Sequence, residues 1–144
     1  MNDFITVFGD LSNLRDYTCL AFDVGRSQTG LAVGNSISRL GQPLAAIEFE
    51  KFFPKSWNEI EQVIADWQVK LIIVGEPKDT PNTARKMRGF AKNIHARTSL
   101  PTVLLDESYT TAAAKQALSK KVAKSAIDSY SAMLLIEQWF AINV

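Results

Sequence analysis

The sequence predicts an α/β protein with a five-stranded mixed sheet and helices on both faces. Its 144 residues are a typical length for one domain. Apolar residues make up 47% and charged residues 22%, the balance of an ordinary globular protein. The hydrophobic pattern also changes from short strand-like runs to helical spacing after Pro54. We therefore expect a single domain over residues 1–144, in which the polar and weakly patterned residues 1–16 form an N-terminal extension.

Three strands are expected in the first part of the chain. Residues 18–22 form a short apolar run that ends in Asp23-Val24-Gly25, and residues 30–34 form a second run bounded by glycines. Two such runs separated by a turn-rich stretch indicate a β-hairpin. Residues 43–49 resemble a third strand, so the first half predicts a three-stranded antiparallel meander.

Helices and strands are expected to alternate in the second part. Apolar residues at helical spacing predict a helix over 56–68 with Ser56 as its N-cap. Further helices are expected at 81–97, 110–118 and 125–140, and buried strands at 71–75 and 102–105. Right-handed crossovers place the fourth and fifth strands parallel to the first, which gives the strand order 3-2-1-4-5.

Several carboxylates fall at the ends of these elements. Asp23 ends the first strand, Glu76 follows the fourth, Asp106 and Glu107 end the fifth, and Asp128 begins the last helix. The carboxyl ends of parallel strands share one edge of the sheet, where ligands of open α/β sheets bind. Clustered, partly desolvated carboxylates favour their protonated form unless a cation compensates them. Mg²⁺ or Mn²⁺ suits such oxygen ligands, and two ions about 3.5–4 Å apart can cleave a phosphodiester.

Four of these acids also have a structural explanation that the residues alone leave open. Asp23 suits a turn in which its carboxylate accepts backbone hydrogen bonds. Asp128 has the S-x-x-D spacing of a capping box with Ser125. Glu76 and Glu107 would both be reasonable as solvated loop acids.

Charge is distributed unevenly although the net charge is only +1. Basic residues gather at 78–97 and at 115–124, where acids are nearly absent. Such segregation either presents a basic face to phosphates or reflects ordinary solvated helix faces. The candidate nucleic-acid contacts are Arg26, Arg85, Lys86, Arg88, Lys92 and Lys121.

Other residue types exclude several functional classes. With one cysteine, Cys19, and one histidine, His95, a zinc site or Cys–His catalysis is excluded. We expect Cys19 to be a small buried apolar residue, His95 to lie on the surface, and Trp67 and Trp139 to lie in the core. No apolar run reaches the roughly 18 residues of a membrane span. Acid near the N-terminus differs from a secretory signal, so a cytoplasmic protein that does not engage membranes is expected.

Five short segments occur in an order that resembles one known family. They are residues 20–25 (Leu-Ala-Phe-Asp-Val-Gly), 30–34, 73–75, 105–107 and 127–129. Together they are similar to the YqgF/RuvX family, which has a ribonuclease H-like fold and is described as Holliday-junction resolvases and nucleases of the small-subunit ribosomal RNA precursor. The resemblance implies that Asp23 and Asp128 are metal ligands and that Asp106-Glu107 supply the remaining acid.

The sequence also departs from the family pattern around these segments. Glu76 stands in place of a leucine, Ser108 in place of an arginine, and the turn at 26–29 and the loop at 78–83 are altered. The third carboxylate therefore stays open among Glu107, Asp106 and Glu76.

Two functions remain in consideration. The first is a Mg²⁺- or Mn²⁺-dependent endonuclease acting on precursor ribosomal RNA or branched DNA, with Asp23, Glu107 and Asp128 as its main ligands. The second is a catalytically weak or inactive module that binds nucleic acid or assembling ribosomes. A homodimer would suit symmetric cleavage of two strands, and the apolar helix end at 136–140 is a candidate interface.

Overall fold

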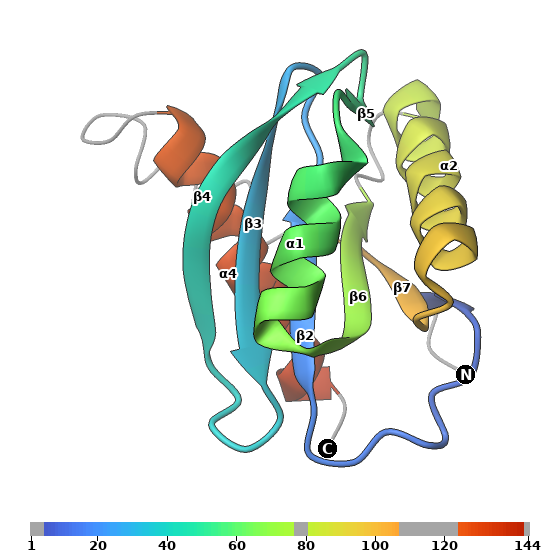
Figure 1. Cartoon of the computed structure of the whole chain (residues 1–144), viewed down its shortest axis with the longest axis vertical. Coiled ribbons are helices and arrows are strands. Elements are labelled where there is room, and N and C mark those ends of the chain that lie inside the picture. The colour runs from blue at the N-terminus through green and yellow to red at the C-terminus, as the bar shows by residue number, and fades with distance from the viewer. Residues whose placement is uncertain (1–4, 77–80, 107–123, 143–144) are drawn as a thin grey trace.

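The computed structural model describes residues 5–76, 81–106 and 124–142. For residues 124–128 it describes the backbone only. Seven strands form one mixed sheet in the order β1-β7-β6-β2-β3-β4-β5 (Figure 1). The strands are β1 (Ile5–Phe8), β2 (Thr18–Asp23), β3 (Gln28–Asn35), β4 (Gly41–Glu50), β5 (Phe53–Pro54), β6 (Val69–Glu76) and β7 (Thr102–Asp106). The described helices are α1 (Trp57–Trp67), α2 (Pro81–Thr98) and α4 (Lys124–Ile142).

The strand order predicted from sequence is confirmed for the five central strands, β4-β3-β2-β6-β7. The predicted number of strands is wrong, because β1 and β5 extend the sheet at its two edges. β1 lies within the segment expected to be a weakly patterned extension, and it pairs antiparallel with β7 from Ile5↔Leu105 to Phe8↔Thr102. A four-residue strand carries little periodicity of its own, so its formation depends on the partner that the fold supplies.

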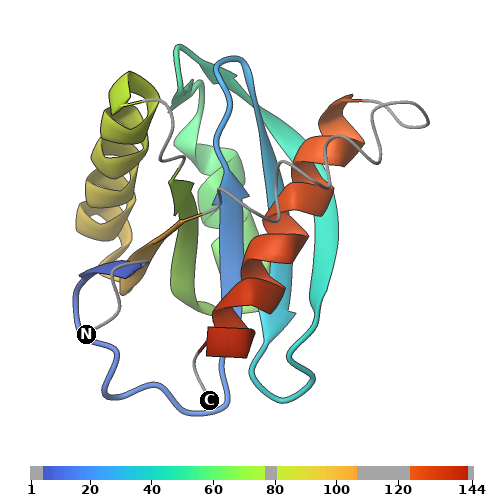
Figure 2. The ribbon, with the colours of Figure 1, turned by 180° about the vertical axis from the view of Figure 1, so that it is seen from behind.

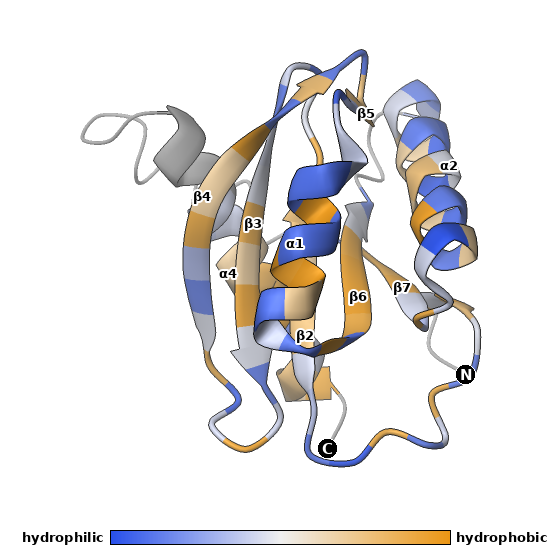
Figure 3. Cartoon of the chain, in the orientation of Figure 1, coloured by the Kyte–Doolittle hydropathy of each residue, from blue (hydrophilic) through white to orange (hydrophobic). Residues whose placement is uncertain are grey.

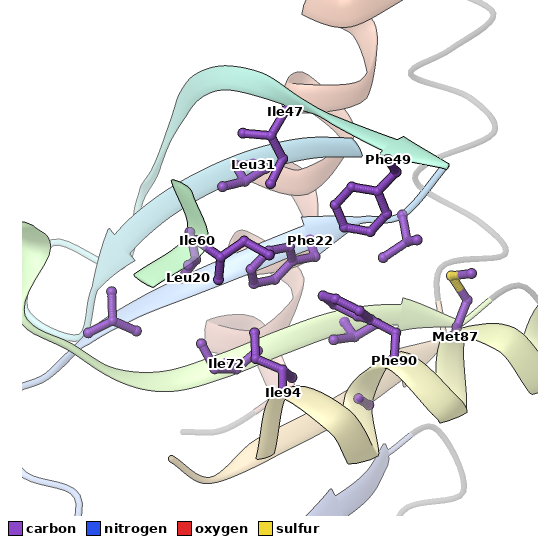
Figure 4. Packing of buried hydrophobic residues seen from close by; sticks show 14 of the residues in the cluster. Leu20, Phe22, Leu31, Ile47, Phe49, Ile60, Ile72, Met87, Phe90 and Ile94 are labelled. Atoms are coloured by element: carbon purple, nitrogen blue, oxygen red, sulfur yellow. The ribbon is translucent and has the colours of Figure 1, made fainter. Parts of the chain in front are cut away.

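Alternate residues of β2 face opposite sides of the sheet and enter two separate cores. Leu20 and Phe22 pack beneath α1 and α2, where Phe22 meets Phe90 edge-on at 5.2 Å between ring centroids (Figure 4). Cys19 and Ala21 pack instead beneath α4 with the other core residues of that face (Figure 2). The prediction of helices on both faces is therefore confirmed, as is a buried Cys19.

The outer face of α2 is strongly hydrophilic, whereas β2 and β6 are largely hydrophobic (Figure 3). The apolar residues predicted for this helix, from Met87 to Ile94, are buried. At the start of α1, the Ser56 hydroxyl accepts a hydrogen bond from the Asn58 backbone N–H at 3.2 Å, which confirms the expected N-cap. Trp67 is 40% exposed, so its predicted place in the core is wrong. It lies in the last turn of α1 and lines an open hollow with Leu40 and Gln42.

α4 approaches the sheet closely because β3 and β4 present glycines to it. A Cβ added to Gly34 would lie 2.6 Å from the Ile136 side chain, and one added to Gly41 would lie 2.8 Å from that of Met133. Trp139, as predicted, and Phe140 are buried against the sheet within one chain. The apolar end of α4 is thus accounted for without a second copy. Among the described helices, none is long and apolar enough to cross a membrane.

His95 departs from the surface position expected of it. It is half-buried, its Nδ1 lies 2.8 Å from the Leu100 carbonyl oxygen, and its ring stacks on Phe8 at 6.5 Å between centroids. Phe8 belongs to β1, so the wrong expectation for His95 follows from the missed strand.

Candidate active site

Three carboxylates lie at the carboxyl ends of three adjacent strands. Asp23, Glu76 and Asp106 are the last residues of β2, β6 and β7. In the parallel registers Phe22 is level with Val74, and Glu76 is level with Asp106. The three residues are only 4%, 5% and 8% exposed. Because a charge so far from water is costly unless compensated, an acidic edge of this kind requires cations or hydrogen-bond donors.

The turn after Asp23 is held by its own neighbours. Asp23 pairs with Gly30 across β2 and β3, and the Gly25 backbone N–H donates to the buried Thr29 hydroxyl at 3.2 Å. A Cβ added to Gly25 would lie 2.2 Å from the Gln28 carbonyl oxygen. Only glycine fits this close approach, so the Asp-Val-Gly segment folds tightly and fixes the backbone next to Asp23.

Glu76 forms an ion pair with a residue of α2. Arg88 donates to a Glu76 carboxylate oxygen at 2.9 Å, and the arginine side chain remains 45% exposed. Hydrogen bonds between two charged groups are among the stronger ones in proteins. Arg88 thus compensates the negative charge of Glu76, the acid that stands where the family pattern has a leucine. A role for Glu76 as a metal ligand would compete with this ion pair.

The amino-terminal part of α4 is fastened to the sheet beside Asp23. The buried Ser129 hydroxyl donates to the Leu44 carbonyl at 2.7 Å and accepts from the Leu31 N–H at 3.4 Å. These contacts link β3 and β4 where their register shifts between Thr29 and Leu31. Leu31 is also the partner of Phe22, the residue before Asp23. Ser129 therefore holds the backbone that follows Asp128 close to the end of β2.

Some of the expected site residues fall outside the description. These are Glu107, Lys121 and the side chain of Asp128. Within the described segments, no group of three or more His, Cys, Asp or Glu residues could hold a metal ion. Buried carboxylate oxygens are the donor type that Mg²⁺ and Mn²⁺ prefer, so the donor chemistry fits. A complete set of ligands would need Asp128 or Glu107 in addition to the described acids.

The candidate phosphate contacts among the described residues are exposed to solvent. Arg26 is exposed on the turn between β2 and β3, and Arg85, Lys86 and Lys92 are exposed on α2. Lys86 Nζ lies 5.1 Å from the centroid of the Phe52 ring. A basic helix face therefore stands beside the acidic edge of the sheet, which is an arrangement suited to a polyanion with a reactive phosphate.

A protein-family model described as Holliday junction resolvase, RuvX, matches residues 17–142. The chain belongs to the RuvX family. A relative from Haemophilus ducreyi is 39% identical over 136 residues, covering 88% of this chain and 97% of the relative. A relative from Legionella pneumophila strain Paris is 36% identical over 129 residues, covering 83% of this chain and 92% of the relative. Both carry the name "Putative pre-16S rRNA nuclease".

Solved structures place this RuvX family member in a known fold. RuvC of T. thermophilus, solved with a Holliday junction substrate, is similar with a TM-score of 0.53 at 12% identity, covering 88% of this chain and 95% of that one. The fowlpox virus Holliday junction resolvase is similar with a TM-score of 0.51 at 14% identity, covering 88% of this chain and 98% of that one. These likenesses support the expected ribonuclease H-like fold. Strand β1 precedes the segment that the RuvX model matches.

Three contributors to this edge were missed from the sequence. The sequence patterns indicate Ser129 only as part of the segment at 127–129, Thr29 only as part of the turn at 26–29, and Arg88 only as a phosphate contact. Arg88 follows Glu76 by 12 residues, and no sequence spacing signals a contact between a strand end and the following helix. Ser129 directly follows an expected site residue, which was the one available signal of its position.

Proposed function

We propose that this protein is a nuclease that hydrolyses phosphodiester bonds in structured nucleic acid. The observation that carries the proposal is the placement of buried Asp23 next to Glu76 and Asp106 at one sheet edge, in a chain of the RuvX family. Buried carboxylates at an edge where ligands bind are costly to keep, and a function that uses them accounts for that cost.

Asp23, Asp128 and Glu107 are the proposed ligands of Mg²⁺ or Mn²⁺, with Asp106 and Glu76 as further carboxylates at the same edge. A bound divalent metal would supply activation of water and stabilisation of negative charge at the phosphate. Asp23 is held by its tight turn, and Ser129 fixes the start of α4, so these residues would keep their positions during the reaction. Arg88 would keep the Glu76 carboxylate oriented through their hydrogen bond of 2.9 Å.

The substrate is proposed to be the precursor of 16S ribosomal RNA, processed at its 5′ end. Support comes from the names of relatives that this chain covers almost fully. Four-way DNA junctions are the alternative substrate, because the family description and the similar structures name them. Exposed Arg26, Arg85, Lys86 and Lys92, with Lys121, are the proposed contacts to the nucleic-acid backbone.

Cleavage of both substrates, measured side by side with Mg²⁺ or Mn²⁺, tests the proposal. Asp23→Asn removes a ligand charge with almost no change in shape, so we expect it to abolish cleavage. Asp10→Asn makes the same chemical change at an exposed residue of the N-terminal segment and should leave cleavage intact. Activity that survives in Asp23→Asn would refute the assignment of Asp23 as a ligand.

A non-catalytic binding module is the second candidate function. The Arg88–Glu76 ion pair favours it, because it compensates one acid of the edge without a metal. Salt-sensitive RNA binding without any cleavage would support this candidate. A homodimer, which symmetric cleavage of a junction would require, stays a prediction that light scattering can test.

A further inference from the structure

The connection between β4 and β5 is an unusual two-residue turn. Lys51 and Phe52 have φ angles of 52° and 67°, so both lie in the left-handed region. Such hairpin turns are normally built from Asn and Gly, and a bulky residue there is strained by about 1–3 kcal/mol. A backbone conformation that contradicts the preference of its residue types in this way often marks a functional position.

The surrounding contacts hold this turn in place. The Phe52 N–H donates to the Arg26 carbonyl at 3.0 Å, and the Phe49 N–H donates to the Ser27 carbonyl at 2.9 Å. The Phe52 ring packs against the core beneath α1 and α2 and lies beside Lys86. The turn is therefore rigid, and it is joined through the backbone to the loop that follows Asp23.

Phe53 presents an aromatic ring to solvent next to this turn. It is 40% exposed and rests edge-on against Trp57, at 5.7 Å and 81° between the rings. Trp57 in turn stacks on Phe90 at 6.0 Å with an interplanar angle of 7°. An exposed ring supported from behind in this way keeps its orientation, which favours stacking of a flat partner.

Charged side chains of both signs lie near the turn that precedes Phe53. Arg26, Lys51 and Lys55 line a shared hollow with Glu48 and Glu50, and Lys86 Nζ lies over the Phe52 ring, 5.1 Å from its centroid. Lys55 is paired with Glu48 at 3.5 Å, whereas no ion pair joins Arg26, Lys51 or Lys86 to an acid of the described segments. We call Arg26, Lys51, Phe52, Phe53 and Lys86 the hairpin surface.

The hairpin surface lies at the same end of the molecule as the acidic edge. β5 and the tip of β4 stand at the end toward which β6 runs and at which α2 begins (Figure 1). Arg26 belongs to the turn that links Asp23 to β3. A nucleic-acid strand that crosses the hairpin surface can thus continue toward Asp23.

We propose that the hairpin surface binds an unpaired stretch of the nucleic-acid substrate, with one base stacked on Phe53. Lys51, Arg26 and Lys86 would contact the adjacent phosphates. Aromatic rings stack well on bases that are not already stacked in a helix, so this surface selects single-stranded segments over duplex. The inference rests on the proposed function for its substrate class, and it adds a preference for unpaired nucleotides beside the cleaved bond.

Binding measured by fluorescence anisotropy, with the Asp23→Asn protein, tests this inference without cleavage. The probes are a short unstructured labelled RNA and the same RNA annealed to its complement. Phe53→Leu keeps an apolar side chain against Trp57 but loses the aromatic face, so single-strand binding should weaken about tenfold. Phe53→Trp should retain it, and duplex binding should change little in either variant.

Leu40→Ala is the matched control, because Leu40 is 63% exposed and lies in the loop between β3 and β4, at the other end of the molecule. Single-strand binding that is the same in Phe53→Leu and Leu40→Ala would overturn the inference, and so would equal weakening of single strand and duplex. If the unmodified protein cleaved neither substrate, the proposed nuclease function would be refuted, but the inference about single-strand binding would not. A Phe53-dependent preference for single strands would then stand without it.

Discussion

Two serines on α4 should respond differently to replacement by alanine, because only one of them is hydrogen-bonded. Ser129 and Ser131 are both buried and lie two residues apart. The Ser129 hydroxyl makes hydrogen bonds to Leu44 and Leu31, whereas the Ser131 hydroxyl has no hydrogen-bond partner among the described residues. Replacing each serine by alanine removes a single oxygen atom, so the comparison isolates the value of its hydrogen bonds.

Ser129→Ala should lower the free energy of unfolding by about 2–3 kcal/mol, because it removes two hydrogen bonds and leaves buried backbone groups with one partner fewer. Most of this loss in unfolding free energy comes from the shorter hydrogen bond, which joins the Ser129 hydroxyl to the Leu44 carbonyl at 2.7 Å. The bond from the Leu31 N–H is 3.4 Å long and therefore contributes less. Ser131→Ala removes a buried hydroxyl without a partner, so it should be neutral or stabilise by about 1 kcal/mol.

Urea unfolding followed by circular dichroism measures both values. Both variants should keep the denaturant dependence of the parent protein, because the surface exposed on unfolding hardly changes. Equal losses in the two variants would refute the reasoning, since they would show that any polar-to-apolar change in this helix costs the same. A loss below about 0.5 kcal/mol for Ser129→Ala would also refute it, because that is the size expected of an ordinary surface substitution.

Three further predictions concern the acidic edge and the core. Arg88→Ala should destabilise the fold by about 1–2 kcal/mol, because it leaves buried Glu76 without its ion pair, and Glu76→Gln in the same protein should recover most of the loss in urea unfolding. Gly25→Ala should cost about 1–3 kcal/mol or more, since its Cβ would meet the Gln28 carbonyl, and thermal unfolding should show the loss. Burial raises the pKa of the Cys19 thiol to about 12, so iodoacetamide should label it at about pH 8.5 only after unfolding. Because this pKa is higher in the folded state, its contribution to stability is present below about pH 8.5 and is lost as the pH rises toward 12.

The five central strands and the meeting of Asp23, Glu76 and Asp106 were predictable because they follow from local patterns. A continuous apolar run such as β6 indicates a strand buried on both faces, and right-handed crossovers then fix which strand ends are neighbours. Acids placed directly after those runs must meet at one edge.

Features that depend on distant partners could not be predicted in this way. β1 is a strand because β7 offers it an edge, and His95 is half-buried because β1 covers it. The Arg88–Glu76 ion pair depends on how α2 lies across the sheet. The left-handed turn at Lys51 and Phe52 contradicts the local preference of these residues, so no sequence pattern indicates it.

β1 also changes which part of the sheet is open to other chains. Without it, β7 would present a row of unpaired backbone groups along an apolar strand, Thr-Val-Leu-Leu-Asp, and such edges recruit strands from neighbouring molecules. With it, the outermost strand on that side is a four-residue segment, followed by Gly9 in a left-handed conformation that turns the chain away. Short, interrupted edges are poor templates for continued pairing. The N-terminal strand therefore protects the protein from aggregation, at the edge of the sheet where β7 would otherwise be exposed.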